Sequence, residues 1–91
     1  MSTPPITDSL IEYPCAFPIK VFGQTQQGFL QAVTEVVLQH DPSFTAASIT
    51  LRNSKTAKYV SLTCTVNATS REQLDALYQS LCDHPLVVMV L

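Results

Sequence analysis

Charged residues are scarce in this sequence: they make up 13% of its 91 positions, and only five of them are lysine or arginine. Proteins that bind nucleic acid neutralise its phosphates with clustered basic residues, whereas this chain has a net charge of −2 at pH 7. The composition therefore argues against nucleic acid as a general partner. Three of the five basic residues nevertheless fall close together, and they leave open a local basic site formed by Arg52, Lys55 and Lys58.

Long apolar runs are also missing. The longest one extends from Leu86 to Leu91, whereas a membrane-spanning helix needs about 20 such residues. No basic residue precedes Lys20, and no apolar block of secretory length occurs near the start, so we expect no signal peptide. These features predict a cytoplasmic protein that does not span a membrane.

Cysteine is too rare and too widely spaced to indicate a disulfide framework or a metal site. Cys15, Cys64 and Cys82 are odd in number and lack the spacing of a Cys-x-x-Cys motif, so we expect free thiols. His40 and His84 each have an aspartate beside them, but they close two different predicted helices, where an imidazole is favoured by the helix dipole. We expect no catalytic residues, no metal and no cofactor.

The residues that are present predict six secondary-structure elements. Apolar residues alternate with polar ones in the strands and recur at helical spacing in the two helical segments, which stop before Pro42 and Pro85. Either Ser70 with Gln73 or Thr69 with Glu72 has capping-box spacing for the second helix. The expected elements are a strand at 17–24 closed by Gly23, a helix within 26–42, strands within 47–54 and 58–68, a helix within 69–85 and a strand at 86–91.

This order of strand, helix, strand, strand, helix, strand predicts a ferredoxin-like fold of the α+β class. Right-handed connections give an antiparallel sheet with strand order 4-1-3-2 and both helices on one face. We expect one domain at residues 15–91. Residues 1–14, which contain three prolines and a short apolar patch, are expected to form an arm that docks onto it.

In that strand order the last strand lies at an edge of the sheet. Edge strands are normally guarded by charge, proline or a bulge, and nothing of this kind is visible after Pro85. A second copy of the chain, the N-terminal arm or a different protein would each cover the exposed edge, and a homodimer is our main expectation. The expected interface residues are Phe22, Leu86, Val87, Val88, Met89, Val90 and Leu91.

The sheet face opposite the helices carries mostly hydroxyl groups. RNA-recognition domains of this fold stack bases on aromatic residues of the first and third strands, and here only Phe22 and Tyr59 could do so. Nucleic-acid binding is therefore the alternative function, and it would use Arg52, Lys55, Lys58 and Tyr59. The residues expected on this face are Lys20, Phe22, Thr50, Arg52, Tyr59, Ser61, Thr63 and Thr65.

Four segments resemble a known family. "LIEYPCAFPIKVFG", "SKTAKYVSLT", "NATSREQLDALYQSL" and "VVMVL" are together similar to the YbeD-like family of small bacterial proteins of unknown function. A role in lipoate regulation has been suggested for that family, and its fold is similar to the ACT-type regulatory domains of amino-acid metabolism. The resemblance implies a non-enzymatic regulatory or adaptor protein, and it carries over no catalytic residue.

The similarity to ACT domains also implies dimers and a small-molecule effector bound near a strand-to-helix loop. In this sequence the corresponding loop is "GQTQQG", where backbone N–H groups at the start of a helix could receive the carboxylate of a small metabolite. An ordinary strand-to-helix turn is the alternative. The residues of this ligand hypothesis are Gly23, Gln24, Thr25, Gln26, Gln27 and Gly28.

Overall fold

Two long strands with alternating apolar residues form the centre of the molecule. The computed structural model describes residues 12–91, and the part of the predicted arm at residues 1–11 lies outside this range. Tyr13, which precedes the first strand, packs against the hydrophobic core.

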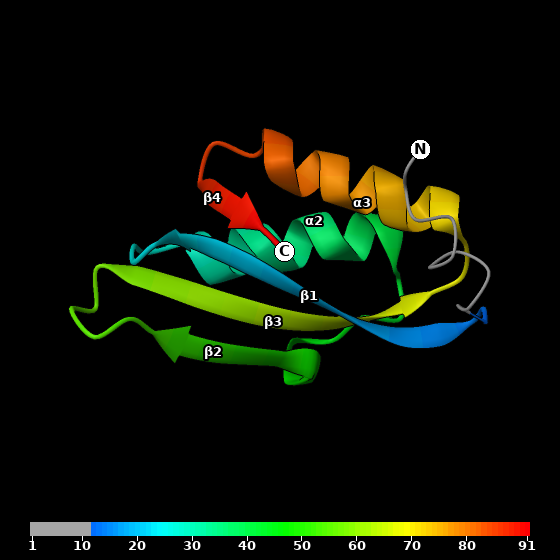
Figure 1. Ribbon diagram of the computed structural model, residues 1–91, viewed down its shortest axis with the longest axis horizontal. Coiled ribbons are helices and arrows are strands. Elements are labelled where there is room, and N and C mark those ends of the chain that lie inside the picture. The colour runs from blue at the N-terminus through cyan, green and yellow to red at the C-terminus, as the bar shows by residue number, and fades with distance from the viewer. Residues whose placement is uncertain (1–11) are drawn as a thin grey trace.

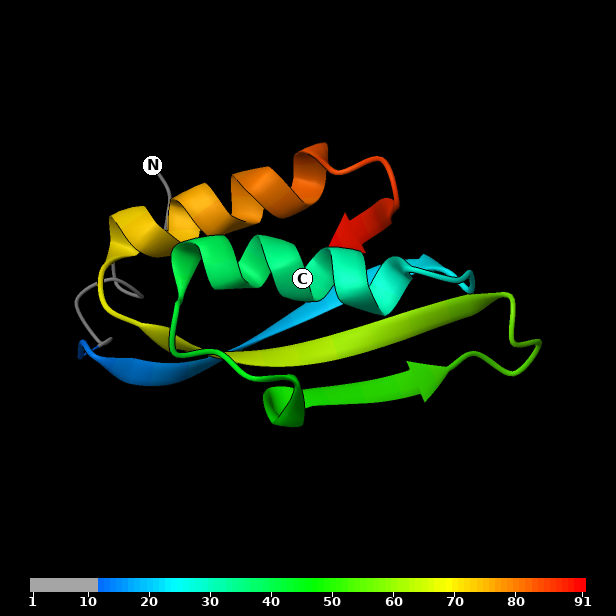
Figure 2. The same ribbon diagram turned by 180° about the vertical axis from the view of Figure 1, so that it is seen from behind.

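The four strands form one antiparallel sheet with the order β2-β3-β1-β4, which is the predicted order read from the other edge. Both helices cover the same face, so the predicted ferredoxin-like fold is confirmed (Figure 1). Seen from behind, the helices lie in front of the sheet and leave β2 uncovered (Figure 2). The elements are β1 (Cys15–Gln24), α2 (Phe29–His40), η1 (Ala46–Ser48), β2 (Ile49–Asn53), β3 (Tyr59–Ala68), α3 (Arg71–Asp83) and β4 (Val87–Val90).

The boundaries differ from the predicted ones at β1, before β2 and at β4, which covers Val87–Val90 where the sequence predicted 86–91. Strand β1 begins at Cys15 and continues through Gly23, since the whole strand pairs with β3. The residues before β2 form the 3₁₀ turn η1, whereas the sequence predicted a strand there. A single turn of three residues has too little periodicity to be distinguished from a strand end.

The core lies between the sheet and the helices. Strands β1 and β3 turn every second side chain toward the helices, as the alternating sequence predicted. Each helix contributes one apolar stripe at spacings of three and four residues. The most completely buried large side chains are Phe29, Ile19, Leu62, Leu77, Leu81, Val21, Val33, Val37 and Val66.

A buried carboxylate connects the end of α2 to the end of β3. Asp41 is only 4% exposed, and its Oδ2 accepts a hydrogen bond of 2.8 Å from the backbone N–H of Asn67. Its Oδ1 accepts from the backbone N–H and the hydroxyl of Ser43, at 3.1 and 2.6 Å. Both carboxylate oxygens therefore have partners, as burial of this group requires.

Gln73 completes this junction from α3. Its Nε2 donates to the backbone carbonyls of His40, at 2.8 Å, and Asn67, at 3.1 Å, and its Oε1 accepts from the backbone N–H of Thr69. The backbone N–H of Gln73 donates to the hydroxyl of Ser70, so the cap of α3 is the predicted pair of Ser70 and Gln73. The ends of α2, β3 and α3 are thus held by two side chains.

The acid stability of the protein should depend on Asp41. Burial opposes ionisation of this carboxyl, but the hydrogen bonds from Ser43 and Asn67 outweigh it and lower its pKa. The ionised group therefore stabilises the fold above the ordinary aspartate pKa of about 3.9, and this contribution disappears as the pH falls through the lower pKa of the folded state. We expect Asp41→Asn to reduce the unfolding free energy at pH 7 by about 1–3 kcal/mol, with a smaller difference in acid.

Urea denaturation at several pH values measures this effect. Asp75→Asn is the matched control, because Asp75 is an exposed helical carboxylate 3.7 Å from Arg71, and such pairs contribute about 0.5 kcal/mol or less. Equal losses for the two variants, or a loss for Asp41→Asn that does not change with pH, would contradict the assignment.

Candidate functional site

Two regions that the sequence treats separately meet at one end of the sheet. Gln24 of β1 pairs with Tyr59 of β3, and the backbone N–H of Thr25 donates to the carbonyl of Lys58 at 2.8 Å. This contact joins the loop at 25–28 to the hairpin at 54–58. We call this region the hairpin end.

Two shallow hollows lie at the hairpin end. The larger, of about 320 Å³, is lined by Gln24, Thr25, Lys58 and Tyr59, and thus by residues of both predicted sites. The second, of about 190 Å³, lies on the sheet face opposite the helices, which we call the open face. Its lining consists of Phe22, Arg52, Asn53, Ser54, Tyr59, Val60 and Ser61.

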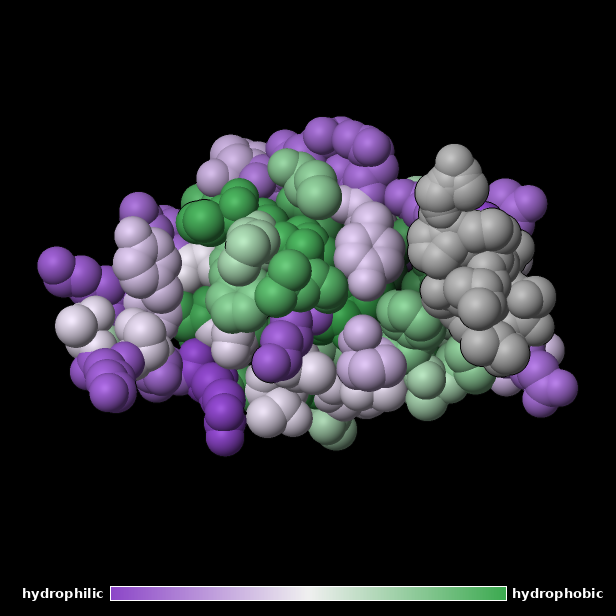
Figure 3. Space-filling view, in the orientation of Figure 1, coloured by the Kyte–Doolittle hydropathy of each residue, from purple (hydrophilic) through white to green (hydrophobic). Residues whose placement is uncertain are grey.

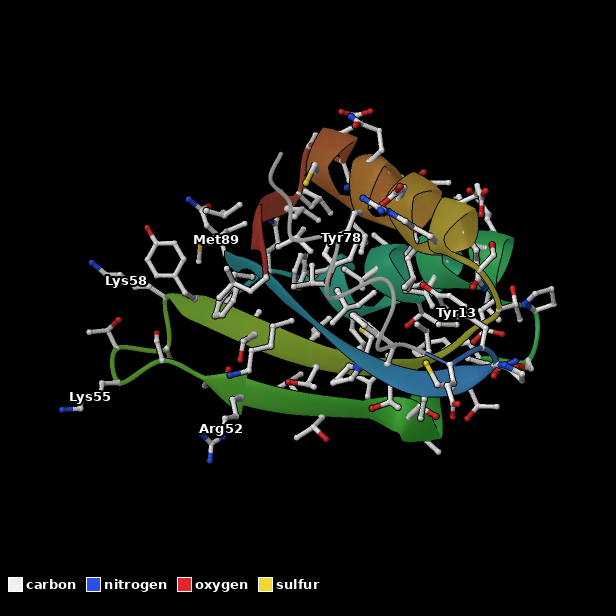
Figure 4. The ribbon with its side chains drawn as sticks, turned by 45° about the vertical axis from the view of Figure 1, so that its right-hand side comes forward. Tyr13, Arg52, Lys55, Lys58, Tyr78 and Met89 are labelled. Carbon is white, nitrogen blue, oxygen red and sulfur yellow. The ribbon has the colours of Figure 1, made fainter. Side chains whose placement is uncertain are left out.

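Tyr59 borders both hollows and is 48% exposed. Its neighbours supply a cation on each side, Lys58 in the first hollow and Arg52 in the second. Figure 4 shows Arg52, Lys55 and Lys58 projecting outward from β2 and the hairpin. An aromatic ring between two cations is suited to a planar or carboxylate-bearing ligand.

The two glycines of the predicted ligand loop have structural roles. Gly23 is buried, and a Cβ there would collide with the Phe29 ring and lie 2.7 Å from the carbonyl oxygen of Leu86. Gly28 begins α2 with φ of 90°, a left-handed conformation that favours glycine. Among the described residues, no side chain caps this helix start.

Charge is separated between the two layers of the domain. Among the described residues, the four strands and the hairpin contain no aspartate or glutamate, although they carry Lys20, Arg52, Lys55 and Lys58. The acidic residues of the described secondary structure lie on the helices: Glu35, Glu72, Asp75 and Asp83. A protein of net negative charge therefore presents a cationic sheet.

Strand β4 exposes apolar side chains at the other edge of the sheet. Val88 and Leu91 are both 62% exposed and Met89 is 46% exposed. Met89 pairs with Phe22 in the register of β1 and β4. Hydrophobic residues gather over β4 in Figure 3, and this surface of Phe22, Val88, Met89 and Leu91 is called the β4 patch below.

The expectation that this edge has no guard is wrong. The register shifts between Phe22 and Gly23, which pair with Met89 and Val87, so Val88 is left without a partner in a β-bulge. The bulge and the short length of β4 interrupt the ladder that a further strand would need. A sequence alternation cannot reveal a bulge in a run where every residue is apolar.

The titratable groups with shifted pKa values are structural. Burial raises the pKa of the Cys64 thiol to about 11, and burial together with nearby Cys82 raises the pKa of Tyr78. His40 Nε2 lies 3.0 Å from the hydroxyl of Ser80, and His84 Nδ1 accepts a hydrogen bond from the backbone N–H of Leu86.

In residues 12–91, no three His, Cys, Asp or Glu residues gather as they would around a metal. None of the helices in that range is long and apolar enough to cross a membrane.

Comparisons with known proteins identify relatives along almost the whole chain. A family model described as protein of unknown function (DUF493) matches residues 8–91. A UPF0250 protein of Nitrosomonas europaea is 55% identical over 84 residues, which is 92% of this chain and 97% of that protein. A UPF0250 protein of Bordetella parapertussis is 58% identical over 87 residues, 96% of each chain.

A solved structure shares the fold. The solution structure of protein HP0495 from H. pylori is similar to this chain with a TM-score of 0.69 and 20% identity, covering 89% of this chain and 85% of the other. At that identity the likeness concerns the fold alone. Together with the sequence relatives, it confirms the predicted fold and the predicted resemblance to a bacterial family of unknown function.

The structural role of Gly23 predicts a large loss of stability on substitution. Gly23→Ala should lower the unfolding free energy by about 1–3 kcal/mol, because the new Cβ would overlap both the Phe29 ring and the Leu86 carbonyl oxygen. Gly28→Ala is the matched control: its new Cβ would meet no atom from another part of the fold within 4 Å, so only the left-handed backbone opposes it, at about 1 kcal/mol. Chemical denaturation of both variants tests this, and a smaller loss for Gly23→Ala would contradict the packing argument.

Proposed function

The chain belongs to the family described as protein of unknown function (DUF493), and from its surface we propose that it is a non-catalytic regulatory or adaptor domain that associates with itself. The observation that carries this proposal is the β4 patch, where Val88, Met89 and Leu91 are exposed and the half-buried Phe22 pairs with Met89. Such patches are typical of interaction sites. The raised pKa values of Cys64 and Tyr78 come mainly from burial, as expected for groups with a structural role.

A second copy of the chain is the proposed occupant of the β4 patch. The side chains of Phe22, Val88, Met89 and Leu91 are apolar, so they can pack against the same side chains of a second copy about a two-fold axis. The bulge at Val88 disfavours continuation of the sheet from one copy to the next. The proposed interface therefore consists of packed side chains.

The site for a small carboxylate ligand is proposed at the larger hollow of the hairpin end. Lys58 supplies a cation there, and Gln24, Thr25 and Tyr59 supply hydrogen-bonding groups. This proposal moves the ligand from the whole loop at 23–28 toward the contact between that loop and the hairpin, because Gly23 is buried. A cytoplasmic role connected with lipoate is compatible with this chemistry, since lipoate bears a carboxylate.

Nucleic-acid binding is the alternative function. It is favoured by the hollow on the open face, where Phe22, Tyr59 and Arg52 line one surface. Aromatic rings beside a cation bind unpaired bases without sequence preference. The hydroxyl groups of Ser61, Thr63 and Thr65 occupy the rest of that face of β3, however, and offer no further stacking surface.

Self-association should depend on Met89. We expect the intact chain to form dimers in light scattering across a wide dilution series, and Met89→Lys to weaken dimerisation at least about tenfold, because the ammonium group would be buried without a partner. Leu51→Lys is the matched control, since Leu51 is exposed to a similar extent, 48% against 46%, at the opposite edge of the sheet. A monomeric intact chain, or dissociation by Leu51→Lys alone, would contradict the proposal.

A small carboxylate should raise the melting temperature through Lys58. We expect at least one compound from a panel of amino acids, octanoate and lipoate to stabilise the fold, because a ligand that binds only the folded state shifts the equilibrium toward it. The shift should disappear in Lys58→Ala and persist in Lys55→Ala, which removes a neighbouring cation outside the hollow. No shift with any compound, or equal loss in both variants, would argue against this site.

A further inference from the structure

Strand β2 is an exposed and regular sheet edge. It lies opposite β4 in the strand order and pairs with β3 without a register shift. Its residues Thr50, Leu51, Arg52 and Asn53 are all exposed. The helices leave it uncovered in Figure 2, so both of its faces and its outer edge are accessible within the described part of the chain.

The backbone groups of two β2 residues point away from the sheet. The backbone N–H of Ser54 donates to Tyr59 across the hairpin at 2.9 Å, which sets the phase of the ladder. Because hydrogen-bonded and non-hydrogen-bonded pairs alternate in antiparallel strands, Leu51 and Asn53 direct their N–H and C=O groups outward. An extended segment added along β2 can pair with these groups.

The two faces of β2 differ in chemistry. Leu51 is on the helix side, and Leu30 and Leu38 of α2 are also exposed, at 43% and 39%. These two leucines lie on the side of α2 away from α3, because His40 on the other side contacts Ser80. On the open face β2 carries Thr50 and Arg52, and Lys55 follows in the hairpin.

Charge decides which occupant fits this edge. If two copies of β2 paired antiparallel about Leu51, their Arg52 side chains would lie on one face at about 7–8 Å, and the described strands contain no acidic residue to offset them. An acidic segment paired with β2 would instead be attracted, since its carboxylates would face Arg52 and Lys55. The edge thus disfavours a second copy and favours an acidic partner.

We propose that β2 is a docking edge for an extended acidic segment of a partner protein, in which carboxylate and apolar side chains alternate. Its carboxylates lie beside Arg52 on the open face, and its apolar residues lie beside Leu51 on the helix side. The β2 edge is separate from the β4 patch, so this proposal does not depend on self-association.

The probe is a short synthetic peptide that alternates glutamate and valine, titrated against the full chain by fluorescence anisotropy. We expect binding. In a parallel NMR titration, the chemical-shift changes of the protein should be concentrated at the backbone amides of Leu51 and Asn53. Arg52→Glu should weaken binding about tenfold. Lys20→Glu is the matched control, because it makes the same charge reversal on β1, away from the edge, and should change affinity by no more than about twofold.

Three further ligands complete the experiment. A peptide alternating lysine and valine should not bind, and a glutamate and valine peptide N-methylated along one edge should bind at least about tenfold more weakly, because it cannot complete the ladder. Failure of the acidic peptide to bind, equal weakening by Arg52→Glu and Lys20→Glu, or unchanged binding of the methylated peptide overturns the proposal. Binding of single-stranded RNA, lost in Lys55→Glu and Lys58→Glu, with no binding of the peptide, also overturns it and favours the nucleic-acid alternative.

Discussion

The structure depends on the ionised carboxylate of Asp41. This group is buried where α2 ends, and its hydrogen bonds to Asn67 and Ser43 determine how the chain leaves the helix and passes the end of β3. Gln73 binds the carbonyls of the same two segments, His40 and Asn67, from the first turn of α3. Both helices are therefore positioned over the sheet from one polar junction. The opposite end, with the hairpin and the loop after β1, is joined mainly by backbone hydrogen bonds such as that from Thr25 to Lys58, and it carries the exposed residues Lys55 and Lys58.

The turns that follow the two helices have the same hydrogen-bond pattern but are formed by different side chains. Each helix ends before a proline, which has no N–H, and in each case the residue before the proline accepts the backbone N–H two positions on. Asp41 does so with Oδ1 and His84 with Nδ1, both at 3.1 Å. The similar sequences "HDP" and "DHP" thus encode one turn. In the first turn, Asp41 also accepts a hydrogen bond from the backbone N–H of Asn67 in β3. This second contact explains why a carboxylate, with two acceptor oxygens, is buried there.

The sequence was sufficient for the fold because its elements are strongly periodic and separated by proline. It also indicated which side chains share the open face, since Lys20, Phe22 and Arg52 follow from simple alternation along each strand. It did not indicate the bulge at Val88, because every residue from Leu86 to Leu91 is apolar and the sequence pattern is then the same for every strand register. The sequence also did not predict that the loop at 25–28 contacts the hairpin. That contact, between Thr25 and Lys58, depends on the register in which β1 pairs with β3. The residues of the candidate site were thus predicted as two separate sites, and the hollow that joins them was not predicted.

The two edges of the sheet differ in chemistry and therefore suit different kinds of partner. The β4 edge exposes apolar side chains and is interrupted by a bulge, so it suits close packing of side chains and disfavours an added strand. The β2 edge is regular and bears the exposed cation of Arg52, which is why an acidic strand is the partner proposed for it. The proposed dimer interface at the β4 patch and the proposed acidic partner at β2 use opposite edges of the sheet, so the two proposals do not compete for one surface. Two separate binding edges are what the proposed adaptor function would require.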